Sequence, residues 1–111
     1  MKRYCLALDL KNDPKLIAEY EKWHQPGNGW PEIRENITSS GITDMQIYRT
    51  GNRLTMIMET TDDFSFQHQA ELAAINPKVQ DWEVLMSEYQ QPLPWAKEGE
   101  KWLLMDQIFQ L

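Results

Sequence analysis

The segment from Tyr20 to Ile33 carries the strongest candidates for chemistry in this chain, because it combines a phenol, an imidazole and a rigid loop. Tyr20 and His24 are four residues apart, a spacing that places two side chains on one face of a helix, a turn apart. A phenol and an imidazole that share a cavity can act on a ligand as general acid and base. The same residues would also cap and pack a helix end, and the segment alone leaves that alternative open.

His24 stands where this helix is expected to end, just before the turn Pro26-Gly27-Asn28-Gly29. The negative end of the helix dipole stabilises an imidazolium, which favours a proton-transfer role. The other histidine, His68, lies in a polar helical patch without a matching constellation, so a structural or surface role is expected for it. The two histidines have neither the spacing of metal ligands nor nearby cysteines, and no glycine-rich phosphate loop is present. We therefore expect neither a metal nor a cofactor.

The five tryptophans are a high number for a domain of this size. Trp30 and Trp82 both stand at or next to the start of a predicted helix that follows a loop. An aromatic face can stack on the C–H side of a sugar ring while carboxylates accept hydrogen bonds from its hydroxyls. The candidate hydroxyl acceptors are Asp9, Glu59, Glu83 and Asp106. Core packing is the expected role of Trp23, Trp95 and Trp102.

Composition narrows the classes of partner. With 111 residues the chain has room for one domain, residues 1–111. The net charge of −6 argues against a nucleic-acid partner, because phosphate backbones are bound by clustered Lys and Arg. A neutral or weakly charged small molecule fits better. The single cysteine, the absence of a signal-peptide pattern and the absence of a long apolar run predict a soluble cytoplasmic protein with no membrane partner.

The first half of the chain shows both the period of two that is typical of strands and the longer period that is typical of helices. Large apolar residues at every second position predict a strand from Tyr4 to Leu10. Asp13-Pro14 starts a helix that ends near His24, and Pro31 starts a second one that ends at Ser40-Gly41. Two strands follow, around residues 45–48 and 54–60, joined by Thr50-Gly51-Asn52 in a hairpin.

In the second half, the residue pattern predicts a helix from Phe64 to Ile75, capped at Asp62, and another helix that starts at Asn76-Pro77. Residues 91–99 form a loop, and Trp102 to Phe109 reads as a final strand that is well covered. The order strand, helix, strand, strand, helix, strand predicts an α+β fold, the ferredoxin-like βαββαβ sandwich, with each helical crossover divided in two by a proline.

In this fold the helices cover one face of the sheet, and an open apolar face commonly pairs with a second copy. We therefore expect a homodimer of the dimeric α/β barrel type. On the first strand Leu6, Leu8 and Leu10 should face the helices. Cys5, Ala7 and Asp9 should face the open side, where small side chains beside a carboxylate leave room for a ligand.

The chain resembles the L-rhamnose mutarotase family of small dimeric sugar epimerases. The motifs that carry the resemblance are Glu19-Tyr20-x-x-x-His24-x-Pro26 and Trp30-Pro31-Glu32-Ile33. Further matches are Gly41, Ile47-Tyr48, Val79-Gln80-Asp81-Trp82, Met86 and the closing Ile108-Phe109-Gln110-Leu111. The resemblance spans nearly the whole chain and implies cofactor-free interconversion of the α and β anomers of a deoxy-aldose.

The resemblance also implies roles for single residues. The family's proton-donating histidine falls on His24, its helical sugar-binding tyrosine on Tyr20, and the first of its paired tryptophans on Trp82. The sequence departs from the family at the second tryptophan, a strand tyrosine and a glutamine near the end of the first strand. In this chain these positions are Glu83, Met45 and Asp9, and the loop between Pro26 and Trp30 is two residues longer.

These departures change how a pocket would bind hydroxyls, so L-rhamnose and L-fucose are both candidate substrates. Trp82 and Trp30 are expected as pocket walls, and His24 as the principal acid and base. Two other classes remain open: a cofactor-independent monooxygenase of the same fold, and a non-catalytic sugar-binding or structural dimer. Fold alone does not separate them.

Overall fold

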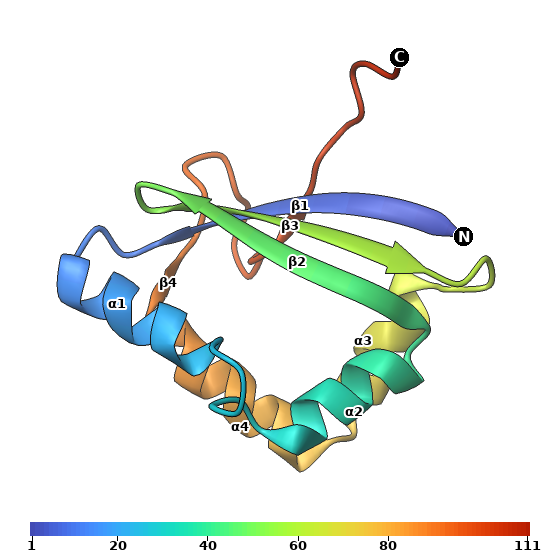
Figure 1. The fold of residues 1–111 in the computed structure, drawn as a ribbon, viewed down its shortest axis with the longest axis horizontal. Coiled ribbons are helices and arrows are strands. Elements are labelled where there is room, and N and C mark those ends of the chain that lie inside the picture. Colours follow the sequence, from blue (N-terminus) through green and yellow to red (C-terminus); the bar gives the residue numbers. More distant parts are fainter.

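The computed structural model describes all 111 residues, as four helices and five strands (Figure 1). In chain order the elements are β1 (Lys2–Leu10), α1 (Pro14–Trp23), α2 (Pro31–Ser39), β2 (Ile42–Thr50), β3 (Arg53–Thr60), α3 (Phe66–Ala74), α4 (Pro77–Ser87), β4 (Gln90–Gln91) and β5 (Leu103–Leu104).

The strands form one antiparallel sheet in the order β2-β3-β1-β4, and β5 also pairs with β1. All four helices lie on one side of this sheet, and the other side is open (Figure 1). This strand order, with a helical crossover after β1 and another after β3, is that of the ferredoxin-like sandwich. The predicted α+β fold class is confirmed.

Strand β1 is the centre of the sheet, and its side chains alternate between the two faces. Leu6, Leu8 and Leu10 are buried under the helices, as predicted. Leu10 belongs to a core cluster beneath α1 and α4, and Leu6 to a second cluster near the start of α3. The members of the first cluster are Leu10, Tyr20, Leu54, Met86 and Tyr89, and those of the second are Leu6, Ile42, Met58 and Phe64.

Prolines and polar caps fix where three of the helices begin. The Asp13 carboxylate accepts hydrogen bonds from the backbone N–H groups of Lys15 (2.9 Å) and Leu16 (3.4 Å), and Pro14 opens α1. Asn76 caps α4 in the same way before Pro77. Pro31 opens α2 with Trp30 at the cap position. Since a first-turn proline lacks only an N–H that would be unpaired anyway, each crossover can be divided into two helices at little cost.

The β2–β3 hairpin turns through Gly51 and Asn52, with Thr50 opposite Arg53. Gly51 has a φ of 56°, which suits the first central position of a tight hairpin turn. Asn52 ties the turn to the end of β1, because its side chain donates to the Leu10 carbonyl at 2.9 Å and its own carbonyl accepts from the Leu10 N–H.

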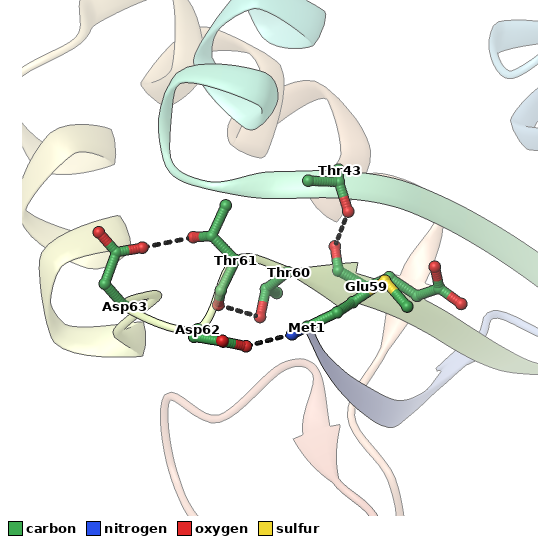
Figure 2. A network of polar contacts seen from close by, with 7 residues as sticks. All are labelled: Met1, Thr43, Glu59, Thr60, Thr61, Asp62 and Asp63. Atoms are coloured by element: carbon green, nitrogen blue, oxygen red, sulfur yellow. Dashed lines mark hydrogen bonds and ion pairs between the residues drawn. The ribbon is translucent and has the colours of Figure 1, made fainter.

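At the opposite end of the hairpin the ladder has a bulge between Ile42 and Asp44. The hydroxyl of the bulged Thr43 donates to the Glu59 carbonyl at 3.2 Å, which replaces part of the interrupted pairing (Figure 2). Nearby, the amino terminus pairs with Asp62, and this cation holds the pKa of the Asp62 carboxyl below its usual value (Figure 2). These contacts join the start of β1 to the segment after β3.

The predicted final strand from Trp102 to Phe109 is wrong in length and in burial. Only Leu103–Leu104 pairs with β1, opposite Ala7 and Leu6. Beyond Met105 the chain leaves the sheet on the side away from the helices, and Ile108 and Phe109 are 96% and 75% exposed (Figure 1). An apolar sequence pattern predicts extended backbone, but it does not supply the neighbouring strand that a ladder requires.

Three other expectations are corrected. The two-residue strand β4 was missed, because Gln90-Gln91 has no apolar alternation, yet it pairs with Leu10 and Asp9. Helix α3 begins at Phe66 with Ser65 as its cap, so Asp62 is not the cap and the predicted start at Phe64 is two residues early. Trp95 is 64% exposed instead of being packed in the core. Trp23 and Trp102 do pack against the core clusters, as predicted.

No helix of the structure is long and apolar enough to cross a membrane.

Asp9 makes a buried ion pair on the open face of the sheet. Its side chain is 5% exposed, and its two oxygens accept from Arg53 Nε at 2.8 Å and Nη2 at 3.2 Å. The carboxylate raises the pKa of the Arg53 guanidinium. Arg53 in turn lies under the Trp95 ring, 5.2 Å from its centroid.

We expect Arg53→Met to destabilise the fold, because it leaves a buried carboxylate unpaired. The loss should be about 2 kcal/mol, below the roughly 3–5 kcal/mol for breaking a fully buried pair, because Arg53 is half exposed and water can replace part of its contact with Asp9. Urea unfolding measures this change. The control is Arg3→Met, which breaks an ion pair with Glu59 whose arginine is largely exposed and should cost under about 1 kcal/mol. Equal losses in both variants would contradict the assignment.

Candidate active site

A cavity of about 390 Å³, open to solvent, lies between helix α1 and strand β2. Tyr20 and His24 line it from the last turn of α1, and Leu54 contributes from β3. Its seven lining residues are Tyr20, Glu21, His24, Ile47, Tyr48, Arg49 and Leu54. The cavity therefore contains the phenol and imidazole that the sequence singled out, and it has room for a monosaccharide-sized ligand.

The end of α1 fixes the orientation of the His24 ring. The backbone N–H of His24 donates to the Glu21 carbonyl at 3.1 Å, and ring atom Nδ1 lies 2.7 Å from the Tyr20 carbonyl oxygen. Because a carbonyl oxygen only accepts, Nδ1 carries the hydrogen and donates it. Nε2 is then the nitrogen that can accept or release a proton toward a ligand.

Tyr20 is part of the core as well as part of the cavity wall. It is 4% exposed and packs in the cluster with Leu10 and Met86, with its ring 4.3 Å from that of His24. Burial raises the pKa of the Tyr20 phenol, and a side-chain hydrogen bond with Gln90 opposes part of that rise. Tyr20 therefore stays protonated at neutral pH, as a hydroxyl that can both donate and accept a hydrogen bond.

An aromatic cluster lies behind His24. The Trp82 ring of α4 is its hub, with centroids at 5.2 Å from Trp30, 5.8 Å from Trp23 and 6.1 Å from His24. The Trp23 indole N–H donates to the Tyr89 hydroxyl at 3.3 Å. These edge-on contacts join the end of α1, the start of α2 and the middle of α4 around the histidine.

A charged pair in the cavity wall was missed by the sequence analysis. Arg49 of β2 forms an ion pair with Glu21 of α1, and its Nη1 also donates to the Gly51 carbonyl at 2.7 Å. The spacing indicated the face of each residue, though not their pairing, because Glu21 precedes His24 by three residues on the helix and Arg49 follows Ile47 by two on the strand. Each spacing places the charged residue on the same face as its neighbour.

The other predicted site residues are more widely spread. Trp82 packs against His24, and Trp30 packs against Trp82. The exposed Glu83 follows Trp82 on α4. Met45 of β2 is half buried against the cluster of Leu6 and Met58, outside the cavity lining. Asp9 projects from the open face and is engaged by Arg53. The structure thus gathers Tyr20, His24, Trp82 and Trp30, and it does not bring Asp9 or Met45 to the cavity.

No group of three or more His, Cys, Asp or Glu side chains is placed to hold a metal ion. The chemistry that the lining residues offer is proton exchange and hydrogen bonding. A ferredoxin-like sheet with a histidine and a tyrosine in an open cavity defines a small α+β protein with a candidate acid–base site.

Comparisons with known proteins identify the family. The family model for L-rhamnose mutarotase matches residues 3–111. The chain is 41% identical over 111 residues to an L-fucose mutarotase of Xanthomonas campestris pv. campestris, covering all of this chain and 89% of the relative. It is also 40% identical over 117 residues to a UPF0734 protein of Dictyostelium discoideum, covering 99% of this chain and 90% of that one.

Two solved structures share the fold at low sequence identity. An L-rhamnose mutarotase from Formosa agariphila superposes with a TM-score of 0.71 at 18% identity, covering 100% of this chain and 99% of the other. The tetracenomycin F2 cyclase of Streptomyces glaucescens, a type II polyketide cyclase, superposes with a TM-score of 0.61 at 15% identity and the same coverage.

The chain belongs to the L-rhamnose mutarotase family. It is an isomerase of the mutarotase type, an enzyme that interconverts the α and β anomers of a sugar.

The buried phenol gives a prediction about stability at high pH. An unfolded chain loses the Tyr20 proton near pH 10, whereas the folded chain retains it to higher pH, because its pKa is raised. Above about pH 10 the unfolded state therefore binds fewer protons, and the stability that is complete below that pH falls as pH rises through the folded pKa. Tyr20→Phe should remove this contribution, about 1.4 kcal/mol for each unit of pKa difference.

Urea unfolding of wild type and Tyr20→Phe between pH 8 and pH 11 measures the difference in slope. Tyr48→Phe is the matched control, because Tyr48 is 57% exposed and should leave the slope unchanged. The prediction is wrong if Tyr20→Phe and wild type lose the same stability over this range.

Proposed function

We propose that the substrate is a 6-deoxy-L-hexose bound in the cavity beside His24, with L-fucose as the first candidate and L-rhamnose as the second. The observation that carries the proposal is the fixed His24 ring, with Nδ1 held by the Tyr20 carbonyl in a cavity of suitable size. The 41% identical relative named L-fucose mutarotase supports the order of the two sugars.

The reaction requires two proton movements and no change in oxidation state. A base removes the proton of the anomeric hydroxyl while an acid protonates the ring oxygen. The bond between C1 and the ring oxygen then breaks, and an aldehyde forms at C1. Rotation about the C1–C2 bond presents the other face of the carbonyl, and reversal of the proton transfers closes the ring as the other anomer.

In this proposal His24 is the principal acid and base, acting through Nε2. The end of α1 supports both states of the ring, because the carbonyls there stabilise an imidazolium and Nδ1 keeps its hydrogen in either state. The protonated Tyr20 hydroxyl binds the ring oxygen or an adjacent hydroxyl. General acid–base help contributes roughly a hundred- to ten-thousand-fold, which suffices for a reaction that already proceeds in water.

Trp82 and Trp30 are proposed as the hydrophobic wall near the sugar, with Glu83 beside Trp82 as an acceptor for a hydroxyl. Asp9 and Met45 were expected to contact the sugar as well. Their positions on the open face and in the core beneath β2 give them no direct path to the cavity within one chain.

His24→Ala should abolish the acceleration of anomer exchange, because no other group in the cavity can both give and take a proton near neutral pH. The loss should be about a hundred-fold or more. NMR saturation transfer between the α and β anomeric protons of L-fucose and L-rhamnose measures it. The fold should survive, because His24 is an exposed residue that follows the last residue of α1.

His68→Ala is the control, since His68 is an exposed histidine on α3 and outside the cavity. It should retain the wild-type rate. Near-normal exchange in His24→Ala would overturn the assignment, and sugar binding without faster exchange in wild type would indicate a binding protein instead of an enzyme.

We also propose that the protein forms a homodimer through the open side of the sheet. The tail after β5 runs out on that side, and its apolar residues have no cover within one chain (Figure 1). Ile108 and Leu111 are almost fully exposed and Phe109 is 75% exposed, an arrangement that is costly in water and favourable when a second copy supplies an apolar surface.

Replacing Ile108 and Phe109 together by serine should shift the dimer toward monomer, because it removes the apolar area that the second copy would bury. Sedimentation equilibrium measures the dissociation constant. Replacing the polar neighbours Gln107 and Gln110 by alanine is the matched control and should leave it unchanged. A monomeric wild type, or equal effects of both double variants, would refute this dimer.

The cytoplasmic location expected from the sequence stays a prediction.

A further inference from the structure

Two of the residues that line the cavity are charged, and they pair with each other across it. Glu21 reaches from α1 and Arg49 from β2, and the side chains are 51% and 37% exposed. Neither has a role in the proton transfers described above. Their position in the wall that holds His24 raises the question of what they contact when the cavity is filled.

Arg49 is held in place by two partners but not saturated by them. Its Nε donates to Glu21 Oε1 and its Nη1 donates to the Gly51 carbonyl at 2.7 Å. A guanidinium has five N–H donors, so three remain without a partner in the protein. Glu21 likewise uses one of its carboxylate oxygens and leaves the other free. The pair therefore presents fixed donors next to a fixed acceptor.

Such a combination suits adjacent hydroxyls of a sugar ring. Each hydroxyl both donates and accepts, so one can take a hydrogen bond from the guanidinium while its neighbour donates to the carboxylate. The two charges compensate each other, so the site favours a neutral polyhydroxyl ligand over a carboxylate or a phosphate. Charged donors fixed in advance lose little freedom on binding, which makes their hydrogen bonds more selective.

We propose that Arg49 is a specificity-determining residue that donates hydrogen bonds to ring hydroxyls of the substrate, with Glu21 as its positioning residue. This rests on the proposed function and adds the site that reads hydroxyl configuration. L-fucose and L-rhamnose differ in configuration at C2, which is next to the anomeric carbon on which His24 acts, and at C4, which lies across the ring from it. Arg49 thus sets which of the two sugars is preferred, and His24 sets the rate of exchange.

The test is Arg49→Met, which keeps the length of the side chain and removes every donor. Saturation-transfer rates are measured over a range of L-fucose and L-rhamnose concentrations to obtain kcat and KM for each sugar. We expect the ratio of kcat/KM values for the two sugars to fall by about 10- to 100-fold, the range for losing hydrogen bonds from a charged donor. The fall in selectivity should come from a raised KM for the preferred sugar, with kcat within about three-fold of wild type.

Arg49→Lys keeps the charge but not the planar fork, so it should also lose selectivity. If Arg49→Met does not fold, the selectivity of Arg49→Lys tests the proposal in its place. Glu21→Gln keeps an acceptor for Arg49 Nε and should retain more selectivity than Glu21→Ala, a difference that a merely structural role would not produce. Arg3→Met removes an arginine paired with Glu59, far from the cavity lining, and should change neither constant.

An unchanged ratio, within two-fold of wild type, in folded Arg49→Met or Arg49→Lys overturns the proposal. If wild type itself accelerates neither sugar, the proposed function fails, and binding of both sugars to wild type and Arg49→Met is then compared by saturation-transfer difference NMR. Weaker binding to the variant would support the hydroxyl site on its own, and equal binding would overturn it.

Discussion

The alternation of side chains along β1 is the constraint on which the rest of this structure depends. Its even-numbered leucines must be buried, and only the helical layer offers enough apolar surface to bury them. Because Leu10 and Tyr20 share one core cluster, burying the strand also fixes the end of α1. The position of the site thus follows from the packing of the central strand.

The site uses a helix end for two purposes. The last turn of α1 leaves the Tyr20 carbonyl without its usual backbone donor, and the His24 ring fills that place through Nδ1. Satisfying the helix terminus therefore orients the imidazole that we propose as the acid and base. One hydrogen bond thus both satisfies the helix end and orients the His24 ring, whose centroid lies 6.1 Å from that of Trp82.

The sheet divides the polar residues of the molecule into two sets with different functions. On the helical side Arg49 and Glu21 form part of an open cavity, where donors remain available to a ligand. On the open side Asp9 and Arg53 satisfy each other in a largely buried pair. Successive residues of a strand point to opposite faces of the sheet. Asp9 is therefore next to Leu10 in the sequence, but its side chain lies on the face of the sheet opposite to the cavity.

Much of this could be derived from the sequence alone. The period-two pattern of Leu6, Leu8 and Leu10, the Pro14, Pro31 and Pro77 helix starts and the Gly51 turn determine the elements, because each depends on local backbone chemistry. The Tyr20–His24 spacing determines that the two rings share a helix face. Only the tertiary structure decided that Gln90-Gln91 is a strand, that Trp95 is exposed, that the tail leaves the sheet and that Arg49 meets Glu21. These depend on which segments become neighbours, and residues 28 apart in sequence carry no local signal of the partner that folding will bring to them.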